Sequence, residues 1–473
     1  MLCLVLCLSS CVVSPAPNYR IDKAAVRIEF TTGLSPDLHL SASYTLENYG
    51  TSVLPFIDVM LPNETRYRTR NILVKVDGQN VNSAQVSGGS SETRTSRIRV
   101  PLDPGWHPRE RRDLVIEYNF SAQDGAEKSE ALAAASFYLI SPGWLPVLQP
   151  PSHVLSSAPS IPAGTTYSVE VPTDFFVLAS GKPRGRKKDR GTVKYQFESR
   201  KEDLAPHVIA GRYVKTPSSR QKNSVSFWTF GPLKGDPAGV EKQIASVSDV
   251  LQKNFGPLDK NSLGMRIVEF AGASSDLTSE PQAVPFPAGV LVSSQAMAAG
   301  IDSPSFSKFI SSALARSWFA NISGPDSPLG ISEGLPEYAE LVVDESLNGQ
   351  PSRHDLVSRF LQEYENACKE AVEKPLISTT MQDPVEQRRI ALAKAPLFFI
   401  ALEDAYGEEA VRRGLTEVLT LLRGQAVGYP DMRAALETAT KKDLTPMFRV
   451  WVYKTGIPDE FRRKYEGAKA GND

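Results

Sequence analysis

The stretch that decides the fold is SALARSWFANISGPDSPLGISEGLPEYAE, residues Ser312 to Glu340. Apolar residues recur at helical spacing at both ends, and the Gly, Pro and Ser residues between them are typical of a loop, so we predict two helices joined by a loop. Ser312 and Arg316 are four residues apart and share one face of the first helix. Glu333 begins the second helix, and Glu337 follows at the same spacing. An arginine on one helix therefore faces carboxylates on the next.

The chain has 473 residues, which is long for a single hydrophobic core, so two or three domains are expected. Its hydrophobic content of 41% and charged content of 23% are typical of a soluble globular protein and disfavour disorder or a membrane bundle. The 53 basic and 54 acidic residues give a formal net charge of -1. The overall charge therefore indicates no nucleic-acid partner, and partners must be inferred from local sites.

Three of the four cysteines lie in the first eleven residues, and only Cys368 lies in the predicted folded part, so no internal disulfide framework is expected. The apolar run that ends at Leu8-Ser9-Ser10-Cys11 resembles a bacterial lipoprotein signal and is shorter than the ~20 apolar residues that span a bilayer. We predict lipidation at Cys11 and a protein anchored in the bacterial cell envelope, on the periplasmic side or the cell surface. No lysine or arginine precedes the run, and the alternative is an apolar N-terminus without a targeting role.

From Ile21 to about residue 214 the pattern is that of β-strands. Val26–Phe30 alternates between apolar and polar residues, and Ile72–Val76 is followed by an Asp-Gly turn signal. Regularly spaced strands of this kind predict an antiparallel β-sandwich or saddle. The basic run Lys182–Arg190 contains Gly and Pro and lies between two predicted strands. We interpret it as a solvated hairpin tip, and the alternative is a basic binding patch.

After residue 214 the pattern changes. Gly239–Phe255 has helical periodicity and stops at Gly256-Pro257, two strands follow, and from Ser305 onward nearly every segment is helical. We therefore predict a multidomain α+β protein, with an antiparallel β domain followed by a small β-sheet and a helical bundle. The predicted boundaries are a signal segment at 1–11, a tether at 12–20, the β domain at 21–214, the second domain at 215–467, divided into 215–300 and 301–467, and a tail at 468–473.

These residues and their order resemble the gluzincin (membrane alanyl) aminopeptidase family, in which H-E-x-x-H-x-W-F-x-N is followed by x-E-G-x-x-x-Y. The resemblance spans about residues 20–465 and implies that the second domain is thermolysin-like. The residues that keep the frame of the family motif are Trp318, Phe319, Asn321, Glu333, Gly334 and Tyr338.

The same resemblance implies that zinc chemistry has been lost. In the family, two histidines and the glutamate of the second helix bind zinc, and the glutamate after the first histidine is the general base. Here Ser312, Ala313 and Arg316 take the histidine and general-base positions, and Glu333 alone remains. Serine is a poor ligand, protonated arginine cannot ligate, and alanine offers no base. We therefore expect neither zinc nor another cofactor. The family's transition-state tyrosine is also missing, because Leu392 takes its position.

We expect Arg316 and Glu333 to form a partly buried ion pair in which the guanidinium replaces the positive charge of the metal, because a lone buried carboxylate is costly. The alternative is that Arg316 points to solvent and Glu333 merely faces the cleft. Glu333 and Glu337 share a helix face, and we interpret them as a solvated stripe or salt-bridge partners rather than a paired-carboxylate hydrolase site.

We predict a catalytically inactive, aminopeptidase-like envelope lipoprotein that binds a peptide or protein in the former active-site cleft, or serves as a scaffold, and does not bind nucleic acid. The alternative is an active zinc aminopeptidase or other metallohydrolase that uses residues the sequence does not identify. The missing H-E-x-x-H pair favours the first prediction.

Overall fold

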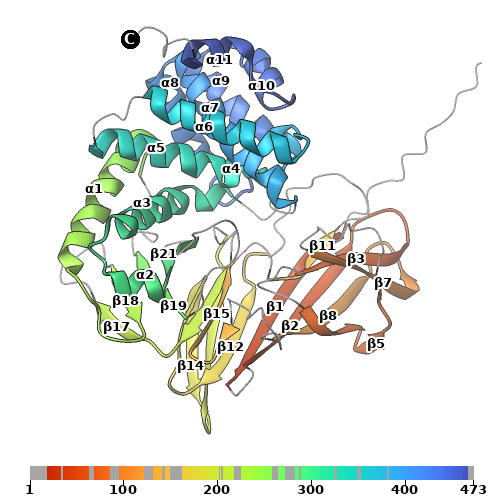
Figure 1. The fold of residues 1–473 in the computed structure, drawn as a ribbon. Coiled ribbons are helices and arrows are strands. Elements are labelled where there is room, and N and C mark those ends of the chain that lie inside the picture. The colour runs from red at the N-terminus through yellow and green to blue at the C-terminus, as the bar shows by residue number, and fades with distance from the viewer. Residues whose placement is uncertain are drawn as a thin grey trace, which may run out of the picture.

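Two structural parts follow one another along the chain, strands first and helices last (Figure 1). The predicted signal segment 1–11 with Cys11, most of the tether and the tail 468–473 lie outside the described residues. Within the described part, no helix is both long and apolar enough to cross a membrane. The computed structural model describes residues 19–32, 36–62, 69–85, 95–121, 132–140, 144–149, 162–201, 203, 206–217, 225–257, 265–271, 283–286, 289–323, 327–348, 353–380 and 383–466.

The N-terminal part consists of three sheets. The largest has eight strands in the order β14-β15-β12-β1-β2-β8-β4-β5, and two four-stranded sheets have the orders β13-β16-β10-β9 and β11-β3-β7-β6. The strands are β1 Tyr19–Thr31, β2 Asp37–Asn48, β3 Leu54–Pro62, β4 Thr69–Val76, β5 Gln79–Val81, β6 Ala84–Gln85, β7 Thr95–Trp106, β8 Arg111–Ser121, β9 Leu132–Ala133, β10 Ser136–Ile140, β11 Val147–Gln149, β12 Thr166–Pro172, β13 Phe176–Ala179, β14 Lys182–Lys188, β15 Thr192–Glu198 and β16 His207–Gly211.

Alternating side chains build the core of this part. Every second residue of β2 is buried along its whole length, as expected for a strand with one face against the core. Buried residues of all three sheets form one cluster, and two of its polar groups are paired with backbone carbonyls. The Tyr118 hydroxyl donates to the Trp144 carbonyl at 2.8 Å, and the Trp144 indole donates to the Pro206 carbonyl at 2.9 Å.

The predicted α+β fold class is confirmed, with one departure from antiparallel pairing: β1 lies parallel to β12. β12 follows strands of the other two sheets in the chain, so no tight turn connects it to β1 or fixes its direction.

A mixed five-stranded sheet joins the two parts. Its order is β17-β18-β19-β21-β20, and β19 is parallel to both of its neighbours. Ile267 and Val290 on one face belong to the core of the helical part, whereas Val268, Phe270 and Leu291 on the other belong to the core of the β part. The strands are β17 Val214–Pro217, β18 Ser226–Thr229, β19 Arg266–Phe270, β20 Ala283–Phe286 and β21 Gly289–Ser293.

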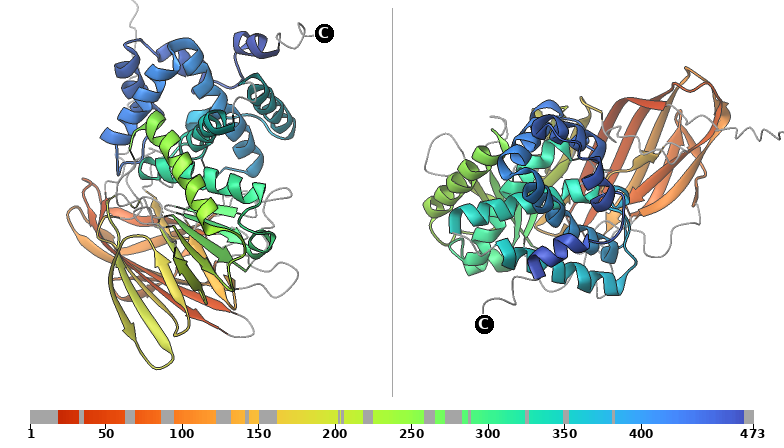
Figure 2. Two further views of the ribbon diagram at one scale, coloured as in Figure 1. Left: turned by 90° about the vertical axis from the view of Figure 1, so that its left-hand side faces the viewer. Right: turned by 90° about the horizontal axis from the view of Figure 1, so that it is seen from above.

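The helical part stacks on one end of the strands (Figure 2). Its centre is α7, which is buried over most of its length. The helices predicted at Gly239–Phe255 and from Ser305 onward are confirmed, whereas the short α2, which precedes Ser305, was not predicted. The helices are α1 Pro237–Phe255, α2 Ser294–Ala299, α3 Pro304–Phe319, α4 Leu329–Ser332, α5 Gly334–Asn348, α6 Arg353–Glu370, α7 Val385–Tyr406, α8 Glu408–Leu421, α9 Tyr429–Thr440, α10 Thr445–Trp451 and α11 Asp459–Glu466, with short 3-10 turns at Ala320–Ile322 and Leu376–Ser378.

Candidate functional site

Helix α3 carries the first half of the candidate site. Its N-cap is Ser303, whose hydroxyl accepts from the Phe306 amide at 3.3 Å. Near its end, the Trp318 indole donates to the Gly256 carbonyl at 3.1 Å, which fixes α3 against the end of α1. Phe319 packs edge-on against Phe255. The aromatic residues of the motif frame therefore hold α3 in place.

Glu333 lies between α4 and α5, and its carbonyl accepts from the Glu337 amide at 3.1 Å in the first turn of α5. The next residue, Gly334, permits a close approach to α7: a Cβ there would lie 2.4 Å from the Cβ of Ala395. The close packing against α7 therefore explains why the residue after Glu333 is glycine.

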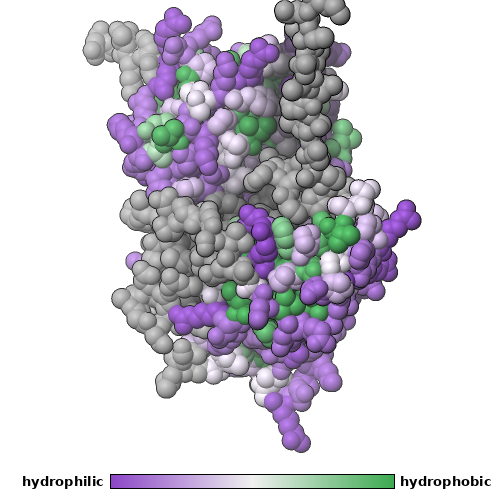
Figure 3. All heavy atoms as spheres, turned by 90° about the vertical axis from the view of Figure 1, so that its right-hand side faces the viewer, coloured by the Kyte–Doolittle hydropathy of each residue, from purple (hydrophilic) through white to green (hydrophobic). Residues whose placement is uncertain are grey.

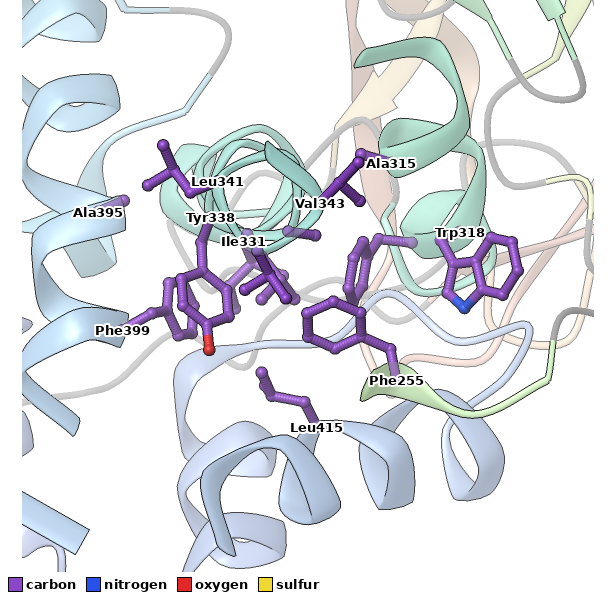
Figure 4. Close-up of a cluster of buried hydrophobic side chains, with 14 of the residues drawn as sticks. Phe255, Ala315, Trp318, Ile331, Tyr338, Leu341, Val343, Ala395, Phe399 and Leu415 are labelled. Carbon is purple, nitrogen blue, oxygen red and sulfur yellow. The ribbon is translucent and has the colours of Figure 1, made fainter. Parts of the chain in front are cut away.

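Tyr338 fixes α5 against α7. Its ring lies beside Phe399 in the buried cluster between the helices (Figure 4). Its hydroxyl donates to Glu403, which also receives Arg412 Nε at 2.8 Å and the guanidinium of Arg353. This buried network satisfies the tyrosine hydroxyl and the glutamate together, so Tyr338 has a structural role.

The predicted ion pair between Arg316 and Glu333 is confirmed. Arg316 Nη1 lies 2.8 Å from Glu333 Oε2, and the two side chains are 29% and 30% exposed. Arg316 is thus turned toward the second helix, so the alternative of a solvent-directed arginine is wrong. The Nε of Arg316 is buried and has no hydrogen-bond partner among the described residues.

Two further carboxylates surround the same guanidinium. Burial acts against the charge of Arg316, but Glu333, Glu337 and Glu340 outweigh it and raise the pKa of Arg316. Burial raises the pKa of Glu337 to about 7; Arg316 acts in the opposite direction, and Glu340, Glu363 and Glu333 raise it further. Three carboxylates therefore share one cation, and one of them titrates near neutrality.

The other positions of the motif lie close by. Burial raises the pKa of Glu340, which Arg316 and a hydrogen bond from Ser312 lower in part. Ala313 is completely buried in the helical core. Leu392 packs partly buried against the same core. Ser312 is thus engaged with a carboxylate, and Ala313 is a packing residue.

Sequence reasoning did not assign Glu340 a partner at this site, although Glu340 follows Glu333 by seven residues, which is two turns of a helix. It also did not predict the Glu403 network. The signals were a glutamate directly after the apolar stretch Ala395–Leu402 of α7, and the arginines at 353 and 412, which lie on other helices.

The donor set at positions 312, 316 and 333 does not fit a zinc ion. Zinc in a catalytic site takes three protein ligands from His, Cys, Asp and Glu. Here the one carboxylate among the three is bonded to a guanidinium, which has no lone pair to offer. In the part of the chain that the structure describes, no group of three or more His, Cys, Asp or Glu side chains is arranged to hold a metal.

The β part, the mixed sheet and the helical part together have the fold of the M1 zinc metallopeptidases. The M1 zinc metallopeptidase from Deinococcus radiodurans superposes with a TM-score of 0.62 at 18% sequence identity, over 94% of this chain and 96% of that one. A glutamate-to-alanine mutant of that enzyme bound to a Tyr-Ser-Ala substrate gives a TM-score of 0.60 at 17% identity, over 93% and 95%. No protein-family model and no curated protein matches this chain in sequence.

Proposed function

We propose that this protein is a catalytically inactive, aminopeptidase-like protein in which an arginine has replaced the zinc ion. The observation that carries the proposal is the 2.8 Å contact between Arg316 and Glu333. A guanidinium keeps a positive charge beside the one remaining carboxylate of the ligand set, and it does so without offering a Lewis acid or a water molecule for attack. The position of the general base is held by Ala313, whose side chain neither accepts nor donates a proton.

The charges of the site support this replacement. An uncompensated carboxylate in a half-buried position is costly, and Glu333 shares its environment with Glu337 and Glu340. Without a cation, three carboxylates would repel one another across a single helix face. Arg316 therefore stabilises the fold at the place where a metal would otherwise supply the positive charge.

We further propose that the protein binds a peptide or protein at the position of the former active site, or that it serves as a scaffold. The solved neighbour with a bound Tyr-Ser-Ala substrate supports the first possibility by its fold, which extends over nearly the whole of both chains. We also propose that Cys11 is lipidated and holds the protein in the bacterial cell envelope. Growth with a labelled fatty acid tests this part: label should enter the protein, and Cys11→Ala should abolish it.

Metal analysis of the purified chain, combined with hydrolysis of aminoacyl chromogenic substrates, tests the loss of catalysis. We expect no stoichiometric zinc and no turnover above that of an Arg316→Ala control. Stoichiometric zinc, or turnover that a chelator abolishes, would overturn the proposal in favour of an active zinc aminopeptidase.

The triple variant Ser312→His, Ala313→Glu and Arg316→His tests whether the backbone still has the geometry of a zinc site. We expect the variant to take up zinc, because Ser312 and Arg316 occupy one helix face, from which Arg316 reaches Glu333 and Ser312 reaches Glu340. A folded variant that binds no zinc would show that the site has diverged beyond a simple exchange of ligands.

A further inference from the structure

A hairpin at the free edge of the eight-stranded sheet forms a second distinctive site. Strands β14 and β15 make this hairpin, and β14 is the outermost strand. All seven residues of β14 are exposed. The hairpin projects from the bottom end of the molecule in Figure 1, and the corresponding end is strongly hydrophilic in Figure 3. It lies in the β part, away from the Arg316 site.

The charge of this hairpin is one-sided. Between positions 182 and 194 the chain has seven basic residues and one acidic residue, Asp189, although its overall net charge is -1. Arg184 is paired with Glu198. Lys187 stands directly opposite Lys194 in the strand register, and like charges in that position destabilise a sheet. Stability of the hairpin therefore does not explain the charges. The basic residues are Lys182, Arg184, Arg186, Lys187, Lys188, Arg190 and Lys194.

Both faces of the hairpin carry positive groups. The register places Arg186 on the same face as Tyr195, and places Lys187 and Lys194 on the opposite face. The Arg186 guanidinium lies 5.3 Å from the centre of the Tyr195 ring, whose hydroxyl donates to the Phe175 carbonyl. Tyr195, the aromatic residue near these charges, therefore interacts with groups of the protein itself.

We propose that the β14–β15 hairpin binds the surface of a membrane that contains anionic phospholipids. Clusters of four to eight Lys and Arg residues bind such surfaces through summed electrostatic attraction, without a shaped pocket. A single-stranded nucleic acid would call for exposed aromatic residues that stack on bases, and a protein partner would call for an apolar centre. The exposed tip, Asp189 to Gly191, offers neither.

This contact is independent of the proposed lipid at Cys11. β12 runs parallel to β1 and antiparallel to β15, so the tip of the hairpin lies beyond the Glu29 end of β1, and Tyr19 lies at the other end. Along β1 the eleven residues from Tyr19 to Glu29 are ten steps of the strand and span roughly 33 Å. The hairpin would therefore bind a membrane at a place well separated from the start of β1. The Cys11→Ala chain tests binding by the hairpin without interference from a lipid.

The test is co-sedimentation of the full-length Cys11→Ala chain with vesicles of phosphatidylcholine, alone or mixed with phosphatidylglycerol. We expect binding only to the mixed vesicles, weakening as salt is added. Neutralising three basic residues at and beside the tip, with Lys187→Gln, Lys188→Gln and Arg190→Gln, should weaken binding to the mixed vesicles about a hundredfold, at about 1 kcal/mol per basic residue. The matched control neutralises three exposed lysines of the helical part: Lys242→Gln, Lys253→Gln and Lys442→Gln.

Three results would overturn the proposal. The first is an absence of binding to the mixed vesicles, and the second is binding that both triple variants reduce equally. The third is preferential binding to a polyanionic polymer, such as heparin or single-stranded DNA, in competition with the vesicles. Circular dichroism of each variant shows whether its fold is intact, so a loss of binding is assigned to charge only for a folded chain.

Discussion

At the scale of single residues, Arg316 interacts with three carboxylates in two ways: it forms a direct ion pair with Glu333 and is attracted to the charges of Glu337 and Glu340. Removal of a partly buried cation leaves the carboxylates uncompensated, which costs more than the pair contributes. Ser312 donates a hydrogen bond to Glu340, and Ala313 is buried and has no polar side-chain group.

We expect Arg316→Gln to lower the free energy of unfolding by about 1–3 kcal/mol, since it leaves three carboxylates without their cation. Urea unfolding followed by circular dichroism measures this as a lower midpoint at an unchanged slope. The control is Arg389→Gln, whose side chain is 43% exposed and 2.6 Å from Glu370. A surface pair of that kind contributes little, so the control should change the midpoint slightly. Equal effects of the two substitutions would contradict the role of Arg316.

Glu337 predicts a pH dependence. Its pKa in the folded protein is raised from 4.5 to about 7, so the folded state binds a proton more tightly than the unfolded chain. The free energy of unfolding that depends on Glu337 is therefore at its full value below pH 4.5, and part of it is lost as the pH rises toward 7. Glutamine does not ionise, so we expect Glu337→Gln to keep its stability as the pH rises and to be more stable than the unsubstituted chain at pH 8. Urea unfolding from pH 5 to pH 8 measures it, with the exposed Glu386→Gln as control. Parallel curves for Glu337→Gln and the unsubstituted chain would contradict the assignment.

At the scale of elements, the close approach of α4 and α5 to α7 sets the geometry of the site. The two helices are near enough that Gly330 and Gly334 both face α7 or α9 side chains. The charged cluster lies on the opposite side of α5 from this contact, because Tyr338 points to α7 and Arg316 approaches from α3.

Gly334→Ala should separate α5 from α7. A Cβ at this position would lie 2.4 Å from the Cβ of Ala395, so backbone must move, and overpacking of this kind costs about 1–3 kcal/mol. Thermal unfolding measures the loss. Gly231→Ala is the matched control, since no atom lies within 4 Å of a Cβ there. The second substitution Ala395→Gly should restore part of the stability of Gly334→Ala, and no recovery would show that the steric reason is wrong.

Sequence patterns predicted the helices and strands better than they predicted which of these elements pack or pair with one another. Alternation and helical periodicity gave the long strands and helices, because each depends on residues close in the chain. The Arg316–Glu333 pair was predicted because the motif frame placed both positions in space. The Glu403 network and the parallel pairing of β1 with β12 depend on contacts between distant segments, and nothing local in the sequence specifies those contacts.

At the scale of the whole molecule, the mixed five-stranded sheet belongs to two cores. Alternate residues of β19 point to opposite sides: Ile267 packs with the helices, whereas Val268 and Phe270 pack with the β part. Phe270 is 1% exposed, and its ring lies 5.5 Å from that of Tyr138. A sheet shared in this way ties the unfolding of one part to the unfolding of the other.

We therefore expect the unsubstituted chain to unfold in one calorimetric transition, and Phe270→Ala to divide it into two. The substitution removes about 3–5 kcal/mol of buried contact from the junction, and most of that contact is with the β part. Ile267→Ala is the matched control on the same strand: it should lower the transition temperature without dividing the transition, because its side chain lies wholly in the helical core. Two transitions in the unsubstituted chain, or division by both substitutions, would show that the sheet does not couple the two parts.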